Sequence, residues 1–124
     1  GPAFLDAFPG RVVNIHPSLL PAFPGVDAQR QALEYGVRVS GCTTHFVDAG
    51  TDTGPIIAQS AVPVLPDDTR DSLAARILPR EHALLVRTLQ WIADERVQIL
   101  DPLDGRRPRV VLRGVEDSPP MEAS

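Results

Sequence analysis

The stretch Val12-Val13-Asn14-Ile15-His16-Pro17 decides how this sequence folds. Its β-branched residues favour a strand, and the proline ends that strand because it cannot donate to a ladder of hydrogen bonds. Side chains alternate between the two faces of a strand, so Asn14 and His16 point to one face and the apolar residues to the other. The stretch therefore predicts a strand whose end carries a neutral amide and a titratable imidazole side by side, where open α/β sheets place their ligand sites.

The rest of the chain predicts strands that alternate with helices, and hence an α/β domain. Gly36 should end the first helix, and Pro79 should bend the second because it removes the hydrogen bond to the Ala75 carbonyl. The turn at Asp104-Gly105 should join the last two strands. The expected elements are helices over 27–35 and from Asp68 or Thr69 to about Ile92, and strands over 41–47, 55–64, 97–100 and 110–112.

The composition fits a folded domain, or part of one, that works without nucleic acid or membrane. The 124 residues are 43% hydrophobic, which is enough for a packed core. The formal net charge of −4 gives no electrostatic reason to expect nucleic acid. No apolar run reaches the roughly 20 residues of a membrane span, and no signal peptide is visible, so we expect a cytoplasmic protein.

The residue types also argue against a metal and against covalent catalysis. The single cysteine, Cys42, cannot form a disulfide or a thiolate zinc site within one chain. The three histidines, His16, His45 and His82, are widely spaced and lack metal-binding patterns, so no metal is expected. The sequence has neither a Gly-rich phosphate loop nor the elbow of a serine nucleophile.

Several polar residues are candidates for chemistry, each with a plainer structural alternative. Asp52 lies in a loop of turn residues, where an aspartate usually forms an Asx turn. His45 has the pattern of a partly buried histidine whose hydrogen bonds are satisfied. Glu81 interrupts the apolar stripe of its helix, so it either faces a pocket or pairs with an arginine. Asn14 and His16 could simply satisfy backbone groups at the strand end.

The run Asn14-Ile15-His16-Pro17-Ser18-Leu19-Leu20-Pro21 resembles the signature of the folate-dependent formyltransferases. The Arg-Gly-Ala segment typical of Met-tRNA formyltransferases is absent, and Pro17 stands where formyltetrahydrofolate hydrolases usually carry a second histidine. The resemblance extends from about residue 1 to about residue 100. The segments similar to the glycinamide ribonucleotide branch of the family are 22–25, 31–36, 40–48, 52–59 and 76–82.

The resemblance implies a Rossmann-like, three-layer α/β fold with a mixed sheet, of which this chain would be only the C-terminal portion. Residues 1–115 would be the C-terminal part of the catalytic domain, and residues 116–124 a flexible tail. The N-terminal half of the same enzyme, which carries the phosphate-binding loop, would be the missing partner, and a homodimer is compatible with the resemblance.

The implied activity is transfer of a formyl group from the co-substrate 10-formyltetrahydrofolate to the amine of glycinamide ribonucleotide in purine biosynthesis. Asn14 would hydrogen-bond the oxyanion of the tetrahedral intermediate, and His16 would stabilise that charge and take part in proton movement. Asp52 would hold His16 or an ordered water and help to protonate the leaving nitrogen. Losing one fixed donor of this kind typically costs about 10²–10³ in rate.

The resemblance also implies the groups around this catalytic set. Glu81 would contact the glycinamide end of the ribonucleotide, although Pro79 two residues earlier could shift its carboxylate, and His45 would support the catalytic set. Two alternatives remain open: another transferase or hydrolase that uses the same folate, and a folate-binding module without activity. Backbone groups expected to line the pterin pocket belong to Val47, Asp48, Ala49, Gly50, Thr51 and Asp52.

Overall fold

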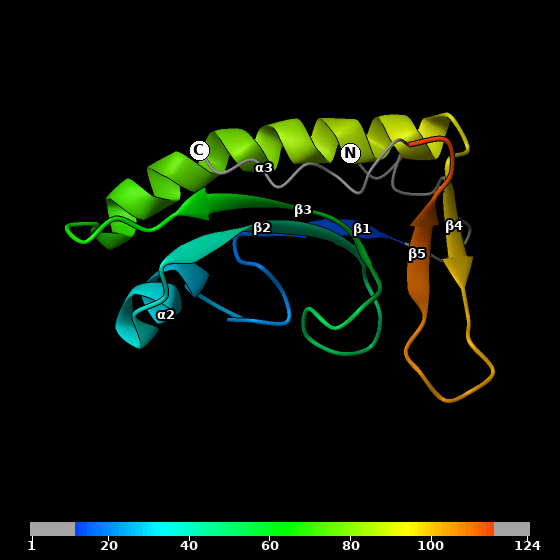
Figure 1. Cartoon of the computed structure of the whole chain (residues 1–124), viewed down its shortest axis with the longest axis horizontal. Helices are drawn as coiled ribbons and strands as arrows, with labels where there is room; N and C mark the ends of the chain where they lie inside the picture. Colours follow the sequence, from blue (N-terminus) through cyan, green and yellow to red (C-terminus); the bar gives the residue numbers. More distant parts are fainter. Residues whose placement is uncertain (1–11, 116–124) are drawn as a thin grey trace.

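The structure is a computed structural model that describes residues 12–115, so the expected tail at 116–124 lies outside the described residues. Figure 1 shows the long helix α3 (Arg70–Ala93) along one face of a sheet, with α2 (Ala28–Tyr35) and the loop after β1 (Val13–His16) toward the other face. A separate hairpin of β4 and β5 stands at one end. The elements are β1 (Val13–His16), α2 (Ala28–Tyr35), β2 (Val39–Phe46), β3 (Ile56–Pro63), α3 (Arg70–Ala93), β4 (Val97–Leu100) and β5 (Arg109–Leu112).

The main sheet has the strand order β1-β2-β3, and both pairs are antiparallel. The α/β class expected from the sequence is confirmed. Because β4 and β5 also pair antiparallel, residues 12–115 contain no parallel pair that a mixed sheet would need. The register places Asn14 opposite His45 and His16 opposite Thr43, so these four side chains share one face of the sheet.

The core lies between the other face of the sheet and α3. Cys42, Phe46, Leu73 and Ile77 are fully buried there. One polar contact crosses this apolar layer, where the hydroxyls of Thr44 on β2 and Thr88 on α3 are 2.9 Å apart and both residues are buried. Since Thr44 faces α3, its sequence neighbours Thr43 and His45 must face away from the helix.

Helix α3 begins at a capping box on Thr69, one of the two residues, Asp68 and Thr69, that the sequence offered as its N-cap. The Thr69 hydroxyl accepts from the Ser72 backbone N–H, and the Ser72 hydroxyl accepts in return from the Thr69 N–H. The helix continues through Pro79 to Ala93 without a break. Figure 1 shows its axis bent in the first half, where Pro79 lies, as expected for a residue that cannot make the intrahelical hydrogen bond.

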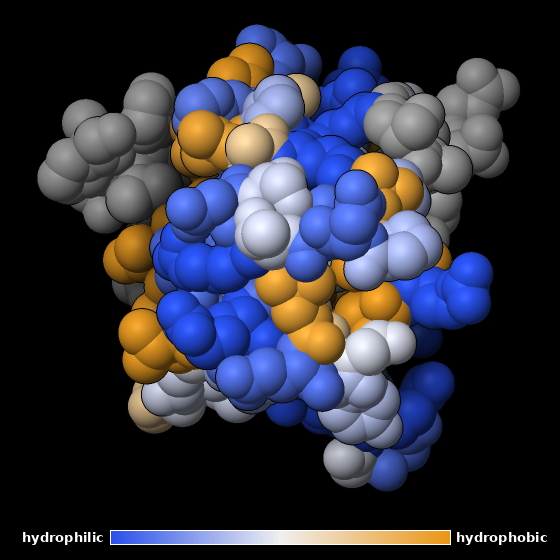
Figure 2. Space-filling view, turned by 90° about the vertical axis from the view of Figure 1, so that its left-hand side faces the viewer, coloured by the Kyte–Doolittle hydropathy of each residue, from blue (hydrophilic) through white to orange (hydrophobic). Residues whose placement is uncertain are grey.

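Ion pairs tie the start of α3 to its surroundings. Arg70 donates to Asp27 at 2.8 Å, which connects α3 to the residue before α2, and Arg76 makes two bonds to Asp68. Figure 2 looks at this end of the molecule and shows a surface that is mostly hydrophilic, with scattered hydrophobic side chains. None of the helices within residues 12–115 is long and apolar enough to cross a membrane.

Candidate functional site

The carboxylate of Asp52 lies between two histidine rings. His16 Nδ1 is 3.4 Å from Asp52 Oδ2, and His45 Nε2 is 3.6 Å from Asp52 Oδ1. The backbone N–H of Gly25 donates to Asp52 Oδ2 at 2.8 Å. The side chains of His16, His45 and Asp52 are 7%, 2% and 12% exposed. The structure therefore brings three of the candidate residues into one largely buried cluster.

The second nitrogen of each ring shows where the histidine protons are. His16 Nε2 is 2.8 Å from the carbonyl oxygen of Phe23, and His45 Nδ1 is 3.0 Å from that of Phe46. A carbonyl only accepts, so both of these nitrogens carry a proton. Each ring then turns its other nitrogen toward Asp52, which as a carboxylate also only accepts. A hydrogen bond between His16 and Asp52 therefore requires one more proton, held on either of them.

His45 is held less completely than His16. Its 3.6 Å separation from Asp52 is within ion-pair reach but too long for a hydrogen bond, so Nε2 has no hydrogen-bond partner within residues 12–115. A buried polar atom without a partner costs free energy, on the order of 1–3 kcal/mol. The plainer expectation of a fully satisfied core histidine is therefore not met, because only one of its ring nitrogens is hydrogen-bonded.

The loop after β1 is fixed by Thr43, which lies opposite His16. The Thr43 hydroxyl donates to the Ser18 carbonyl at 2.7 Å and accepts from the Leu20 N–H at 3.1 Å. The Ser18 hydroxyl in turn bonds the Ala22 carbonyl. This network holds the chain that ends in the Phe23 carbonyl, and so fixes the orientation of the His16 ring from outside the strand.

Asn14 is placed beside this cluster but not within it. It lies opposite His45 in the β1–β2 pair, on the same face as His16. It is exposed, and its side chain makes no hydrogen bond within residues 12–115. The structure therefore leaves the Asn14 amide free on the solvent side of the buried cluster, rather than in contact with Asp52.

Glu81 lies on α3, on the helix side of the sheet, and is half-buried. Within residues 12–115 it has no arginine partner and no hydrogen bond, so the salt-bridge alternative is not found. Burial raises the pKa of its carboxyl above the ordinary value, while the nearby charges of His82 and His16 oppose the shift. Glu81 is thus an acid without an arginine partner among the described residues, and it does not line the pocket beside Asp52.

A pocket of about 270 Å³ opens beside Asp52. Pockets for drug-sized ligands usually measure about 300–1,000 Å³, so this one suits a single ring system rather than a whole extended ligand. Of the loop residues expected to line a pterin pocket, Thr51 and Asp52 line the pocket beside Asp52, whereas Val47, Asp48, Ala49 and Gly50 are not among its lining residues. The lining residues are Leu20, Pro21, Pro24, Thr51, Asp52, Thr53, Gly54, Ile56 and Arg107.

The loop that carries Asp52 is shaped by its own polar residues. Asp48 accepts from the Gly50 N–H at 2.9 Å and from the Thr53 hydroxyl at 2.7 Å, and these bonds lower the pKa of Asp48. At Gly54 a Cβ atom would lie 1.6 Å from the Phe46 carbonyl oxygen, so only glycine fits there. Asp52 adopts a left-handed backbone, with φ 54°, a conformation that is uncommon outside glycine and concentrates at functional sites.

Sequence reasoning missed part of this site. Leu20 and Pro21 belong to the run that carried the resemblance, so the sequence did contain a signal for them. Arg107 comes from the distant hairpin, and no local pattern connects it to Asp52. Among residues 12–115, no group of three or more histidine, cysteine, aspartate or glutamate side chains is arranged to hold a metal ion.

Known proteins resemble this chain over most of its length. The family profile described as "Formyl transferase" matches residues 1–89. A phosphoribosylglycinamide formyltransferase from Mycobacterium tuberculosis is 52% identical over 100 residues, which cover 81% of this chain and 46% of that protein. The crystal structure of glycinamide ribonucleotide transformylase 1 from Symbiobacterium toebii is 55% identical with a TM-score of 0.75, and the match covers 91% of this chain and 50% of that one.

A formyltetrahydrofolate deformylase from Pseudomonas syringae is also similar, at 33% identity and a TM-score of 0.74. That match covers 82% of this chain and 32% of the deformylase chain. This chain thus spans about half the length of the transformylases it matches. Because the profile covers well over half of its residues, the chain belongs to the formyl transferase family.

Proposed function

We propose that this chain forms the C-terminal part of an enzyme that transfers a formyl group from 10-formyltetrahydrofolate to the amine of glycinamide ribonucleotide, in cytoplasmic purine biosynthesis. The observation that carries the proposal is the Asp52 carboxylate, held between His16 and His45 beside a pocket of about 270 Å³. The transformylases from M. tuberculosis and S. toebii support the substrate assignment. The activity belongs to the whole enzyme, including the N-terminal half of the family fold.

The proposed reaction needs charge stabilisation and two proton movements. The amine attacks the formyl carbon and forms a C–N bond, and the carbonyl oxygen becomes an oxyanion. The exposed Asn14 amide donates a hydrogen bond to this oxyanion, and protonated His16 stabilises its charge. The amine loses a proton, the bond between the formyl carbon and folate N10 breaks, and N10 gains a proton.

The cluster around Asp52 is suited to these proton transfers. His16 and Asp52 together need one more proton to form their hydrogen bond, so the pair can release and recover a proton without moving. Asp52 accepts the proton of the amine through an ordered water and returns it to N10. His45 turns its unbonded Nε2 to the same carboxylate and can offset the charge there only when that nitrogen also carries a proton.

Glu81 is proposed to bind the second substrate. A half-buried carboxylate without an arginine partner is free to accept from the amine of the glycinamide ribonucleotide. The ionised form is the one that attracts an ammonium group, and bringing such a group close would favour that form. In this arrangement the folate ring occupies the pocket beside Asp52, and the ribonucleotide approaches from the side of Glu81.

The test is an assay of the full-length protein with 10-formyltetrahydrofolate in the presence and absence of glycinamide ribonucleotide. We expect loss of the formyl donor to depend on the ribonucleotide, and His16→Ala to lower that rate by about 10²–10³ with little change in thermal unfolding. Donor loss that is independent of the ribonucleotide would instead establish the hydrolase activity suggested by the P. syringae deformylase. Folate binding without turnover would leave only a binding module.

A further inference from the structure

Gln59 on β3 connects the middle of the sheet to the loop after β1. His16, Thr43 and Gln59 stand in one row across the three strands, since His16 pairs with Thr43 and Thr43 pairs with Gln59. The three side chains therefore share the face of the sheet that points away from α3. Gln59 Nε2 donates to the Leu20 carbonyl at 2.8 Å and to the Thr43 hydroxyl at 3.1 Å. One half-buried amide thus bonds both the neighbouring strand and the loop.

Leu20 is held by both of its backbone groups. Its N–H donates to the Thr43 hydroxyl at 3.1 Å, and its carbonyl accepts from Gln59. The Thr43 hydroxyl has one donor and two acceptor positions, and all three are used, because it also donates to the Ser18 carbonyl and accepts from Gln59. Leu20 is 3% exposed, so little water can reach it to replace these bonds. Its position therefore depends on Gln59 as well as on Thr43.

The position of Leu20 determines two parts of the site. Its side chain lines the pocket of about 270 Å³. Three residues later, the Phe23 carbonyl accepts from His16 Nε2 at 2.8 Å. The Ser18 hydroxyl reaches the carbonyls of both Ala22, at 2.5 Å, and Phe23, at 3.3 Å, so this short segment is braced from within. A shift of Leu20 would therefore move the carbonyl that holds the His16 ring.

We propose that Gln59 is a positioning residue for His16. Its two hydrogen bonds keep the loop after β1 where the Phe23 carbonyl can accept from His16 Nε2, and so keep Nδ1 directed to Asp52. The inference rests on the proposed function, because it names a residue that supports the same catalytic set. Within residues 12–115 Gln59 makes no hydrogen bond to His16 or Asp52, so it acts through the loop.

A neutral amide is suited to this role. The Leu20 carbonyl only accepts, so its partner must carry an N–H or O–H. An amide supplies that donor without placing a further charge beside the cluster of His16 and Asp52. Catalytic side chains need such support, because a small error in their placement lowers the rate strongly.

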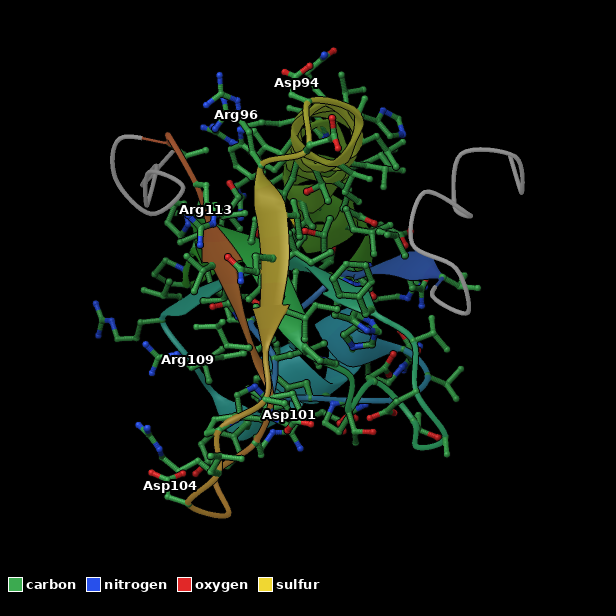
Figure 3. All side chains as sticks on the ribbon, turned by 90° about the vertical axis from the view of Figure 1, so that its right-hand side faces the viewer. Asp94, Arg96, Asp101, Asp104, Arg109 and Arg113 are labelled. Atoms are coloured by element: carbon green, nitrogen blue, oxygen red, sulfur yellow. The ribbon has the colours of Figure 1, made fainter. Side chains whose placement is uncertain are left out.

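The experiment compares Gln59→Met with Gln98→Met in the full-length protein, each with His16 present and in a His16→Ala background. Methionine is similar in length to glutamine and has no N–H. Gln98 is the matched control, a half-buried strand glutamine whose side chain accepts from Arg113. It lies on the β4–β5 hairpin, which stands in front of the sheet in Figure 3, with Arg113 at the end of β5.

Three quantities are measured for each protein. They are kcat and KM for formyl transfer, the melting temperature, and the long-range nitrogen–proton NMR spectrum of the histidine rings, which reports which ring nitrogen carries the proton. With His16 present, we expect Gln59→Met to lower kcat by about 10- to 100-fold. In the His16→Ala background the same change should lower kcat little further. The NMR signal of His16 should change from one Nε2–H form to a mixture of two forms, and Gln98→Met should change none of these.

An equal fall in kcat in both backgrounds, or an unchanged His16 signal in Gln59→Met, would show that Gln59 only supports the fold and would overturn the inference. If Gln59→Met does not fold, Gln59→Glu is the second variant, because an ionised carboxylate keeps the shape and lacks the N–H. It should show the same loss. A wild-type protein without formyl transfer would refute the proposed function instead, and the NMR comparison would still test the role of Gln59.

Discussion

His16 Nδ1 lies 3.4 Å from Asp52 Oδ2, while Nε2 of the same ring donates to the Phe23 carbonyl at 2.8 Å. The ring is thus held on both sides by groups from two different loops. It cannot rotate to exchange its nitrogens without breaking the bond to the carbonyl. A hydrogen bond between His16 and Asp52 therefore needs a proton between Nδ1 and the carboxylate.

Asp52→Asn should separate the charge of Asp52 from its structural role. The asparagine amide oxygen can still accept from the Gly25 N–H, so the loop should remain folded. The carboxylate that shares a proton with His16 is lost, and we expect formyl transfer to fall by about 10²-fold or more, with little change in the melting temperature. Asp101→Asn, an exposed acid near the hairpin, is the control for removing one negative charge. A variant with near-normal turnover would show that Asp52 is only a turn residue.

Glu81→Gln should weaken function while stabilising the fold at neutral pH. Burial raises the pKa of Glu81 in the folded state, so the folded protein binds a proton more readily than the unfolded chain, and stability falls as pH rises through the window above the ordinary value of 4.5. The glutamine side chain does not ionise, so the variant does not lose stability as pH rises and should be the more stable protein at pH 7. The difference in unfolding free energy between the two proteins should vanish below about pH 4.5.

The accompanying measurements are urea unfolding at several pH values and the KM for glycinamide ribonucleotide, which should rise. Glu34→Gln, an exposed glutamate on α2, should change neither quantity. A Glu81→Gln variant that is less stable at neutral pH would mean that the carboxylate has a favourable partner, and its role in binding substrate would have to be withdrawn.

Asp68→Asn should remove part of the acid sensitivity of the fold. The Arg76 guanidinium holds the pKa of Asp68 well below its ordinary value of 3.8, and the Asp68 side chain is 2% exposed. Its stabilising contribution is therefore present above that ordinary value and is lost as pH falls through the folded-state pKa. We expect the variant to lose about 1 kcal/mol at pH 7 and to show a flatter stability curve in acid, with exposed Asp67→Asn as control. Parallel curves for wild type and variant would contradict this.

The 124-residue chain by itself should transfer formyl groups far more slowly than the same chain combined with the upstream half of a relative. The candidate catalytic residues are all present, but the phosphate anchor implied for the ribonucleotide lies in that upstream half. Positioning two reactants is worth about 7–11 kcal/mol, and under the proposed function the upstream half contributes part of it. The assay mixes the separately purified halves and measures turnover. Full-rate transfer by the isolated chain would show that the ribonucleotide is held entirely within it.

Local sequence signals predicted the elements of the fold well. The β-branched run ending at Pro17 identified β1, and the pair Asp68 and Thr69 marked the start of α3, where the structure has Thr69 as the N-cap. Gly36 adopts the left-handed conformation expected of a residue that ends a helix. The bounds of the strands moved by one or two residues, since β2 begins at Val39 rather than at Gly41.

The contacts that build the site were harder to predict from the sequence. The same-face placement of Asn14 and His16 follows from strand alternation and could be predicted. The bond from Gly25 to Asp52, and the reach of Arg107 to Thr53, join loops that no repeating pattern connects. Such contacts depend on how the loops cross in space, and the burial of Asp52 follows from them.

The hydroxyl pair of Thr44 and Thr88 favours one alignment of α3 on the sheet over other alignments. An apolar layer is non-directional, and a helix shifted along the sheet by one turn can bury a similar area. The 2.9 Å contact between these two hydroxyls exists at only one position of α3 on β2. Replacing both threonines by valine would then leave the helix packed but free to settle in more than one alignment. The pair thus contributes to the uniqueness of the native state more than to its free energy.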